Sequence, residues 1–433
     1  MSKTLVWVLF VVILFTGLFL RLFLYEYTAT PDGDRFKAQA EILVAGKGYS
    51  NAQGLPTAYV SPMFPCFLSL LLSLFGDKTP ILLAAQAVVG LLTCITLWYA
   101  AERAGGRAAG MAALAFSALY LPSCWISKTL LSEVLFTFFF SAMMVLLLRA
   151  VETAGWWSPV LAGALLAAAI LTKPVVLLFP AVMLLWALIL PTPKRLIAVR
   201  ASLCALIIGA ILVAPWSWRN YRAFDAFVPV STQGGASLWL GVHPPDEGFG
   251  FSNWKEADQA LAGRTPSDEA EWNREMTRLA VKEILENPGR FAGLFVLKLF
   301  YFWHPFGGDR YIGFSIYNIF FGLNIALWCL SLIWLSRRNP LSLLVALTVL
   351  YWLLMGALFS PVLRYRYPVE LFIIPAWSVF WFSKERKLKA EWIWSIGLGI
   401  LVTNVVLLLW GHPLYQILRS TFHAFFDPLQ TAL

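Results

Sequence analysis

Charged residues are scarce in this chain: they make up 13% of its 433 residues, whereas 59% are hydrophobic. A soluble globular domain contains about 25% charged residues, so this composition excludes a soluble protein. The five cysteines and four histidines are scattered and lack the paired spacing of a disulfide framework or a metal-binding motif. The sequence also contains no Walker-type loop, no HExxH motif and no ordered Ser, His and Asp set. ATP-driven and zinc-dependent mechanisms therefore receive no support.

Long apolar runs are abundant. A helix needs about 20 apolar residues to cross a bilayer. Suitable runs lie at 5–24, 80–101, 107–123, 130–150, 157–173, 174–190, 197–216, 313–336, 340–359, 368–383 and 392–411. Two shorter runs, 62–75 and 290–305, are predicted to be interfacial or re-entrant. The fold class is therefore an all-α polytopic membrane protein with about 11 transmembrane helices.

Lysine and arginine in the short loops predict the orientation. With the N-terminus in the cytoplasm, the cytoplasmic loops hold Arg103, Arg149, Lys194 and the basic run 384–389. If 62–75 crossed the membrane, several of these residues would lie outside, against the positive-inside rule. The net charge of +9 thus reflects topology, and we expect membrane lipids but no nucleic acid as partners. The first run lacks a small-residue cleavage site and is expected to remain as a signal anchor.

This topology places the first loop (26–79), a polar segment (217–289) and a turn (360–367) on the extracytoplasmic side. The polar segment is too long for a plain loop, and a helix is predicted around 267–286. We therefore divide the chain into a transmembrane core with its first loop (1–216), a lid with an interfacial helix (217–305) and C-terminal transmembrane helices (306–433).

Two acids, Asp32 and Asp34, follow the first apolar run on a Pro/Gly turn. A narrow apolar stripe comes next, at Phe36, Ala40, Leu43 and Val44, and predicts a helix that lies in the interface. A carboxylate on a rigid loop suits a general base that takes a proton from a hydroxyl nucleophile. Alternatively, both acids cap the helix that begins near Arg35. The residues alone leave both interpretations open.

Glu133 and Lys173 are ionisable residues at predicted outer ends of spans. Glu133 opens a span after Ser132, where an acid could instead stabilise the first helical turn. Lys173 lies between two apolar runs, immediately before a proline. A cation in hydrocarbon is costly, so Lys173 is expected to face a cavity or an anionic partner, unless it extends to the outer headgroups.

Arginines complete the cationic set. Arg219 ends a span beside two tryptophans, where interfacial anchoring is the alternative explanation. Arg364 and Arg366 lie on a short outer turn, against the usual charge asymmetry, and an anionic ligand would explain them. Arginine and lysine suit a phosphate. A lipid-linked phosphate ester could enter such a site laterally from the bilayer.

The ordered set of motifs resembles the GT-C superfamily of integral-membrane glycosyltransferases. The similarity is to bacterial relatives of protein O-mannosyltransferases and of lipid A aminoarabinose transferases (family 39-like). The residues that carry it are Leu20, Arg21 and Leu22; Asp32, Phe36, Ala40 and the GKGY run 46–49; Pro62, Pro65, Phe75 and Gly76; LLSE at 130–133; TKP at 172–174; PWSWRN at 215–220; and RYRYPVE at 364–370. Gly33 departs from the pattern, because many relatives have an acidic or small polar residue there.

The resemblance implies transfer of one sugar from a polyprenyl-phosphate carrier, such as undecaprenyl phosphate, to a lipid, glycan or protein acceptor. It also implies inversion and a bacterial inner membrane with the active site facing the periplasm. Asp32 would be the base, with Asp34 as the fallback, and Glu133 would orient the acceptor or a divalent cation. The residues implied for the donor phosphate are Lys173, Arg219, Arg364, Tyr365 and Arg366.

Two other functions remain open. A transporter or flippase of a lipid-linked sugar would more often show matched halves and mid-membrane charges, whereas the ionisable groups here gather at one face. A scaffold subunit of a polysaccharide assembly complex would not need Asp32. The sequence leaves the sugar, the acceptor and the metal requirement undecided.

Overall fold

The computed structural model describes residues 3–153, 155–192, 194–243, 268–303, 339–359 and 363–382, together with residue 420. The regular secondary structure of these residues is helical, and they include no β-strand. The chain forms two compact units, each built from discontinuous segments. The first comprises Met1–Ser231, Ser331–Thr348 and Tyr367–Arg386, and the second comprises Thr232–Leu330, Val349–Arg366 and Lys387–Leu433.

Five helices are long and apolar enough to cross a membrane, which confirms a polytopic membrane protein. They are α1 (Lys3–Phe23), α4 (Thr79–Gly105), α7 (Glu133–Thr153), α10 (Lys194–Phe224) and α16 (Pro340–Leu358). Three shorter apolar segments are α3 (Met63–Phe75), α8 (Trp157–Thr172) and 174–189, which holds a 3-10 turn, η1 (Pro174–Val176), and α9 (Phe179–Ile189). The runs predicted at 313–336 and 392–411 lie outside the described residues.

The run predicted at 107–123 is not one helix. It is divided into α5 (Arg107–Ala118) and α6 (Leu121–Ile126), with Tyr120 in an extended conformation. Pro122 has no N–H, so it cannot donate to the carbonyl of Ala118 four residues earlier and continue the helix. The break therefore leaves carbonyl groups at the end of α5 that need another donor.

Arg21 of α1 supplies that donor. Its guanidinium donates from Nη1 to the carbonyl of Ala118 (2.7 Å) and from Nη2 to that of Ser117 (3.1 Å). A further bond joins Nη1 to the Gly17 carbonyl of its own helix (3.0 Å). The side chain is only 1% exposed. The arginine of the LRL motif thus joins α1 to the end of α5.

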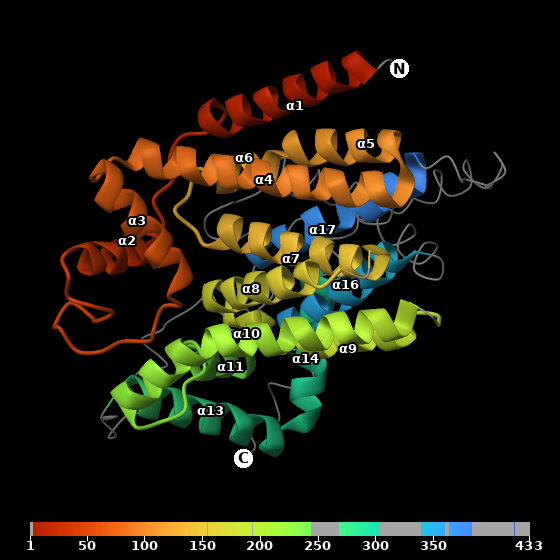
Figure 1. The fold of residues 1–433 in the computed structure, drawn as a ribbon. Coiled ribbons are helices and arrows are strands. Elements are labelled where there is room, and N and C mark those ends of the chain that lie inside the picture. The colour runs from red at the N-terminus through yellow and green to blue at the C-terminus, as the bar shows by residue number, and fades with distance from the viewer. Residues whose placement is uncertain are drawn as a thin grey trace. The chain divides into compact units, whose positions relative to one another are not determined.

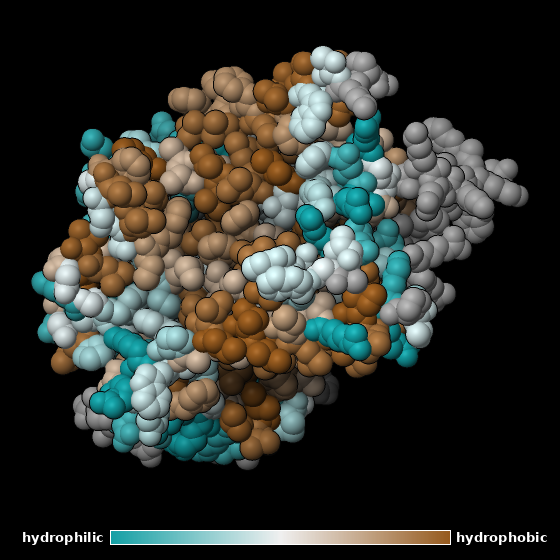
Figure 2. Space-filling view, in the orientation of Figure 1, coloured by the Kyte–Doolittle hydropathy of each residue, from teal (hydrophilic) through white to brown (hydrophobic). Residues whose placement is uncertain are grey.

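The other helices of the first unit pack side by side. Figure 1 shows α4 beside α5, and α8 beside both α7 and α10. Glycine permits the close contact between α8 and α10, because a Cβ on Gly163 of α8 would lie 2.7 Å from the Ala205 carbonyl of α10. Apolar side chains gather over α1 and α4 in Figure 2. Val11 and Phe15 of α1 and Val88 of α4 are exposed. Such a surface suits contact with lipid.

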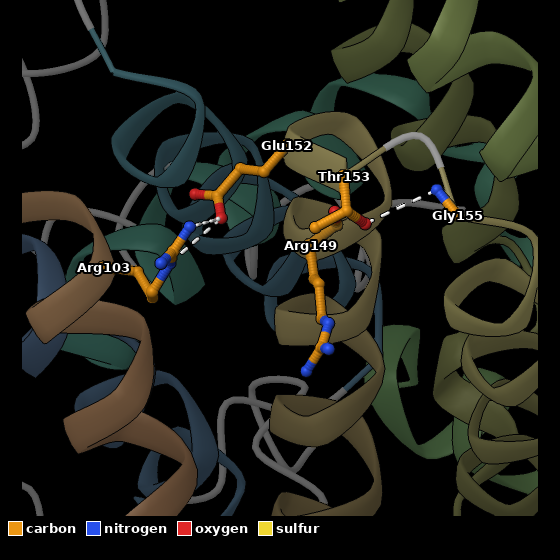
Figure 3. A network of polar contacts seen from close by, with 5 residues as sticks. All are labelled: Arg103, Arg149, Glu152, Thr153 and Gly155. Carbon is orange, nitrogen blue, oxygen red and sulfur yellow. Dashed lines mark hydrogen bonds and ion pairs between the residues drawn. The ribbon is translucent and has the colours of Figure 1, made fainter.

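The end of α4 at Gly105 is polar. Arg103 pairs with Glu152 of α7 (Nη2 to Oε2, 2.9 Å), and Figure 3 shows Arg149 of α7 pointing away from this pair. Both side chains of the pair are partly exposed, so the pair contributes little to stability. Its position fits the basic loops predicted for the cytoplasmic side.

The second unit contains α11 (Gly234–Val242), α13 (Glu269–Glu286) and α14 (Pro288–Trp303). Trp239 of α11 packs with Met276 and Ala280 of α13 in a small apolar core. Asp268 caps α13 by accepting hydrogen bonds from the amides of Ala270 and Glu271. The helix predicted around 267–286 is thereby confirmed.

Two buried cations of α14 cap the C-terminal end of α11. Arg290 donates to the Val242 carbonyl (2.6 Å), and Lys298 donates to the carbonyls of Gly241 and Phe359. The ammonium of Lys298 is buried, and burial, followed by the charge of Arg290, lowers its pKa to about 7. These bonds satisfy carbonyls that a helix end leaves unpaired.

The pH dependence of stability tests this account of Lys298. The unfolded chain keeps the ordinary lysine pKa of about 10.4, so between the folded and unfolded values unfolding takes up a proton. Raising the pH through that window should therefore stabilise the protein. We expect Lys298→Met to flatten this rise in thermal stability, measured in detergent from pH 6.5 to 9.5. Lys282→Met, at an exposed position of α13, is the control, and an equal slope in both variants would contradict the assignment.

Candidate active site

The first-loop acids lie in the first turn of α2 (Pro31–Val44). The helix begins at Pro31 and not near Arg35, so Asp32 and Asp34 are not its N-cap, but as acids in its first turn they complement the helix dipole as expected. Thr30 is the N-cap, and its Oγ1 accepts a hydrogen bond from the amide of Gly33 (3.0 Å). Proline at the first position completes this helix start. The carboxylates are thus not required as the N-cap.

Gly33 sits where the first loop meets the segment before α7. A Cβ at this position would lie 3.2 Å from the carbonyl of Leu130 and 2.9 Å from Thr30 Oγ1. The amide of Thr28 also donates to the carbonyl of Lys128 (2.9 Å). The close approach accounts for glycine at this position. It also places the turn that carries Asp32 beside the residues that lead into Glu133.

Asp32 and Asp34 have different surroundings. Asp32 pairs with Arg35 (Oδ1 to Nη1, 3.3 Å), and the guanidinium lies over the ring of Tyr59, 5.2 Å from its centroid. The Asp32 side chain is 31% exposed, so it is held in place and still reached by solvent. Asp34 is exposed. The pKa of the Tyr27 hydroxyl is raised, mainly by burial and further by the negative charge of Asp34, whereas the positive charge of Lys37 lowers it.

A second contact fixes α2 against α3. Lys37 pairs with Asp77, just beyond the end of α3 (Nζ to Oδ1, 2.8 Å), and this hydrogen bond raises the lysine pKa. Phe36 of α2 packs edge-to-face on Phe64 of α3, with ring centroids 5.1 Å apart. The short run 62–75 therefore forms helix α3, which packs against α2 of the first loop.

Glu133 and Lys173, 40 residues apart in the sequence, form an ion pair. Glu133 is the first residue of α7 and is 2% exposed, and its Oε1 lies 3.0 Å from Lys173 Nζ. Lys173 ends α8 in an extended conformation, because the following proline disfavours the helical region. The structure thus brings together one predicted acid and one predicted phosphate-binding cation.

The C-terminal end of α10 binds two non-helical segments of the chain. Trp216 Nε1 donates to the Val230 carbonyl (2.7 Å) and Ser217 Oγ to the Pro229 carbonyl (2.8 Å). The buried Asn220 donates to the Val228 carbonyl (3.0 Å). These bonds explain the PWSWRN motif as a structural element that holds residues 228–230 against the helix.

Arg219, at the same end of α10, binds the first loop. Its Nη1 donates to the Thr57 carbonyl (2.7 Å), its Nη2 donates to the Tyr49 carbonyl, and its guanidinium lies over the Trp216 ring. Nη1 also reaches the side-chain oxygen of Asn220 (3.1 Å). The contact of Arg219 with a donor phosphate stays a prediction. The observed bonds give this arginine a role in positioning residues 49–57.

Removing the Arg219 side chain should loosen this loop. Arg219→Ala deletes charge-assisted hydrogen bonds worth roughly 1.5–3 kcal/mol each, so the amides of 51–57 should lose about tenfold or more of their protection from hydrogen exchange. The measurement needs no substrate. Arg222→Ala, at an exposed position on the same helix end, should leave protection unchanged. Equal protection in Arg219→Ala and the unaltered protein would contradict this role.

The predicted arginine turn lies in the second unit. Arg366 is fully buried and donates to the Phe302 carbonyl of α14 (3.0 Å). The guanidinium of Arg364 lies 5.2 Å from the centroid of the Tyr365 ring. All three residues belong to α17 (Leu363–Phe382), so the short turn predicted at 360–367 is wrong from residue 363 onward. Their assignment to the donor phosphate stays a prediction.

Three further residues were not predicted to form contacts. Arg35 pairs with Asp32, Arg21 bonds to the end of α5, and Tyr120 donates to the buried carboxylate of Glu370 (2.6 Å). A signal existed for Arg35, which is three residues after Asp32 and therefore on the same helix face. The Tyr120–Glu370 bond spans 250 residues and has no local signal.

The described part of the chain contains no group of three or more His, Cys, Asp or Glu residues that could hold a metal ion. Two of the three predicted acids have a cation nearby, Arg35 for Asp32 and Lys173 for Glu133.

Comparison with solved structures identifies the fold as GT-C. The chain is similar to the Archaeoglobus fulgidus oligosaccharyltransferase tethered with an acceptor peptide, with a TM-score of 0.54 and 10% identity over 94% of this chain and 55% of that one. The same archaeal enzyme in complex with Zn and sulfate is similar with a TM-score of 0.54 and 12% identity, over 91% of this chain and 52% of that one. The chain thus spans about half the length of these archaeal chains.

Residues 59–218 match the dolichyl-phosphate-mannose-protein mannosyltransferase family, which confirms the resemblance to GT-C glycosyltransferases. ArnT from Cupriavidus metallidurans bound to undecaprenyl phosphate is also similar, at a TM-score of 0.44 and 15% identity over 87% of this chain and 78% of that chain. No curated protein matches the chain. The matched range contains Glu133 and Lys173.

Proposed function

We propose that this protein is a membrane glycosyltransferase that moves a sugar from a polyprenyl-phosphate carrier to an acceptor hydroxyl. The observation that carries the proposal is the Glu133–Lys173 pair (3.0 Å) within the range matched by the mannosyltransferase family. The name of that family contains dolichyl-phosphate-mannose, a sugar linked to a lipid phosphate, which supports a donor of this kind. Asp32 lies on a turn packed against Leu130, three residues before Glu133.

The proposed step is a single displacement. Asp32 takes the proton of the acceptor hydroxyl while the hydroxyl oxygen attacks the anomeric carbon of the sugar. The bond from that carbon to the phosphate oxygen breaks, and its electron pair stays on the polyprenyl phosphate. The configuration at the anomeric carbon is thereby inverted. Asp34 is the alternative base, and its exposed position makes it the weaker candidate.

Cations would stabilise the leaving phosphate as its charge develops. We assign Lys173 to this role because its ammonium is already fixed beside a buried acid. The sequence signature adds Arg219, Arg364, Tyr365 and Arg366 to the donor-binding residues. Glu133 holds Lys173 in position and orients the acceptor. The acceptor is a lipid, a glycan or a protein on the extracytoplasmic side of a bacterial inner membrane.

Reconstitution tests this function against the alternative of a flippase. Purified protein in liposomes would receive a membrane lipid extract as the source of donors and acceptors. Transfer should release free polyprenyl phosphate and add one sugar mass to an acceptor, both measured by mass spectrometry. A flippase would move the donor across the bilayer with its sugar-phosphate bond intact, and that result would overturn the proposal.

The acceptor and the sugar can be identified in cells. Envelope glycolipids, glycans and glycoproteins would be compared by mass with and without the gene. The mass that disappears identifies the sugar, and the molecule that loses it identifies the acceptor. An unchanged envelope would count against a transferase and favour a structural subunit.

A further inference from the structure

The charge of Glu133 is balanced within the chain. Its carboxylate is 2% exposed, and a buried carboxylate needs a cation or several donors beside it. Lys173 supplies that cation at 3.0 Å, and its own side chain is 17% exposed. The position of Glu133 at the start of α7 adds the favourable end of the helix dipole.

The archaeal oligosaccharyltransferase, which shares the fold, has been solved in complex with Zn and sulfate, so a divalent ion is the group to test against the residues around Glu133. A zinc site needs three or four protein ligands of the imidazole, thiolate or carboxylate type, whereas a magnesium ion needs one or two carboxylates that are not already paired with a cation, with waters and substrate phosphate completing its shell. In the ranges that the structure describes, no three such side chains gather. Asp32 pairs with Arg35 at 3.3 Å and Glu133 with Lys173, so the residues present do not fit a resident divalent ion.

We propose that the Lys173 ammonium takes the place of a divalent cation: it neutralises Glu133 on one side and binds the phosphate of the lipid donor on the other. An ammonium carries three N–H donors, so one lysine can contact a carboxylate and a phosphate together. A divalent ion placed beside Glu133 would be repelled by the ammonium already there. The inference rests on the proposed function and specifies that donor binding requires no metal.

The extended backbone at Lys173 fits this role. The residue ends α8 and precedes η1, and Pro174 keeps it out of the helical conformation. The side chain therefore extends from a fixed break between two helices toward the first residue of a third. A cation held in this way needs no reorganisation when the donor binds, which is what electrostatic stabilisation requires.

The test measures binding of undecaprenyl phosphate to the full-length protein in nanodiscs, by tryptophan fluorescence, with EDTA or with 1 mM Mn²⁺ (roughly a saturating concentration for a weak site). We expect the unaltered protein to bind equally in both conditions, within about twofold. Lys173→Ala should weaken binding by about tenfold or more in EDTA. Lys47→Ala, an exposed lysine of the first loop, should bind like the unaltered protein.

Two outcomes would overturn the inference. Binding by the unaltered protein that falls about tenfold in EDTA would show a required metal and would leave the proposed transferase standing. Binding by Lys173→Ala equal to that of the unaltered protein would remove the lysine from the site. No binding of the lipid phosphate under any condition would overturn both this inference and the proposed function.

Lys173→Ala removes the counter-charge of the buried Glu133 and could prevent folding. A second variant keeps the test decisive in that case. The double variant Lys173→Ala with Glu133→Gln removes both charges and should fold. Its binding should be as weak as that of Lys173→Ala and equal with and without Mn²⁺. Elemental analysis of the purified, unaltered protein should find well under one divalent ion per chain, and a stoichiometric metal would overturn the inference.

Discussion

Asp32→Asn should abolish sugar transfer while leaving the protein folded. A general base contributes on the order of 10²–10⁴-fold to the rate, so transfer should fall by about that factor. The fold should persist because Thr30, and not Asp32, caps α2 through the amide of Gly33. Initial rates of polyprenyl phosphate release, compared at equal amounts of folded protein, provide the measurement.

The neighbouring acid provides a matched control. Asp34 lies in the same helical turn, carries the same charge and is exposed. Asp34→Asn should therefore keep the rate within a few-fold of the unaltered protein. If Asp34→Asn loses activity and Asp32→Asn keeps it, the base is Asp34. Full activity in both variants would remove the first loop from the chemistry.

Arg21→Met should have the largest effect on stability. Its guanidinium serves the carbonyls of Ser117 and Ala118, which the break before Pro122 leaves without helical donors. Each buried carbonyl without a donor costs roughly 1–3 kcal/mol. Methionine has a similar length and fills much of the volume, so the loss would report hydrogen bonding and charge more than packing.

Thermal unfolding in detergent micelles measures this loss. Arg149→Met is the control, because that arginine is exposed on α7 and points away from the neighbouring Glu152 (Figure 3). Arg21→Lys should have an intermediate effect, since an ammonium can reach fewer of the carbonyls. A melting temperature of Arg21→Met within a degree or two of that of the unaltered protein would show that water or other groups serve these carbonyls.

Hydropathy predicted the described spans well, because the length of an apolar run is a local property of the sequence. Two runs are exceptions: 107–123, which is divided into α5 and α6 at Pro122, and 174–190, which is divided into η1 and α9. The start of α2 was predicted four residues too late. The sequence did contain the correct signal, since threonine followed by proline is a typical helix start.

The composition of the site was partly predictable. Glu133 and Lys173 could be selected as candidates because charged residues beside apolar runs are costly unless they have a function. Their pairing could not be predicted, since it depends on where the start of α7 lies relative to the end of α8. Arg219 was selected for its charge, but its bonds to the Tyr49 and Thr57 carbonyls depend on a loop that lies more than 160 residues away in the sequence.

The bond network of Arg21 has a practical consequence for anyone who shortens the chain. A version that starts after residue 24 would lose the guanidinium that serves the end of α5, and neither lipid nor detergent tails can donate hydrogen bonds in its place. Exchanging the first helix for an unrelated membrane anchor would restore insertion but not this interaction. Fusion partners and purification tags at this end should therefore be added ahead of Lys3, with the whole of α1 retained.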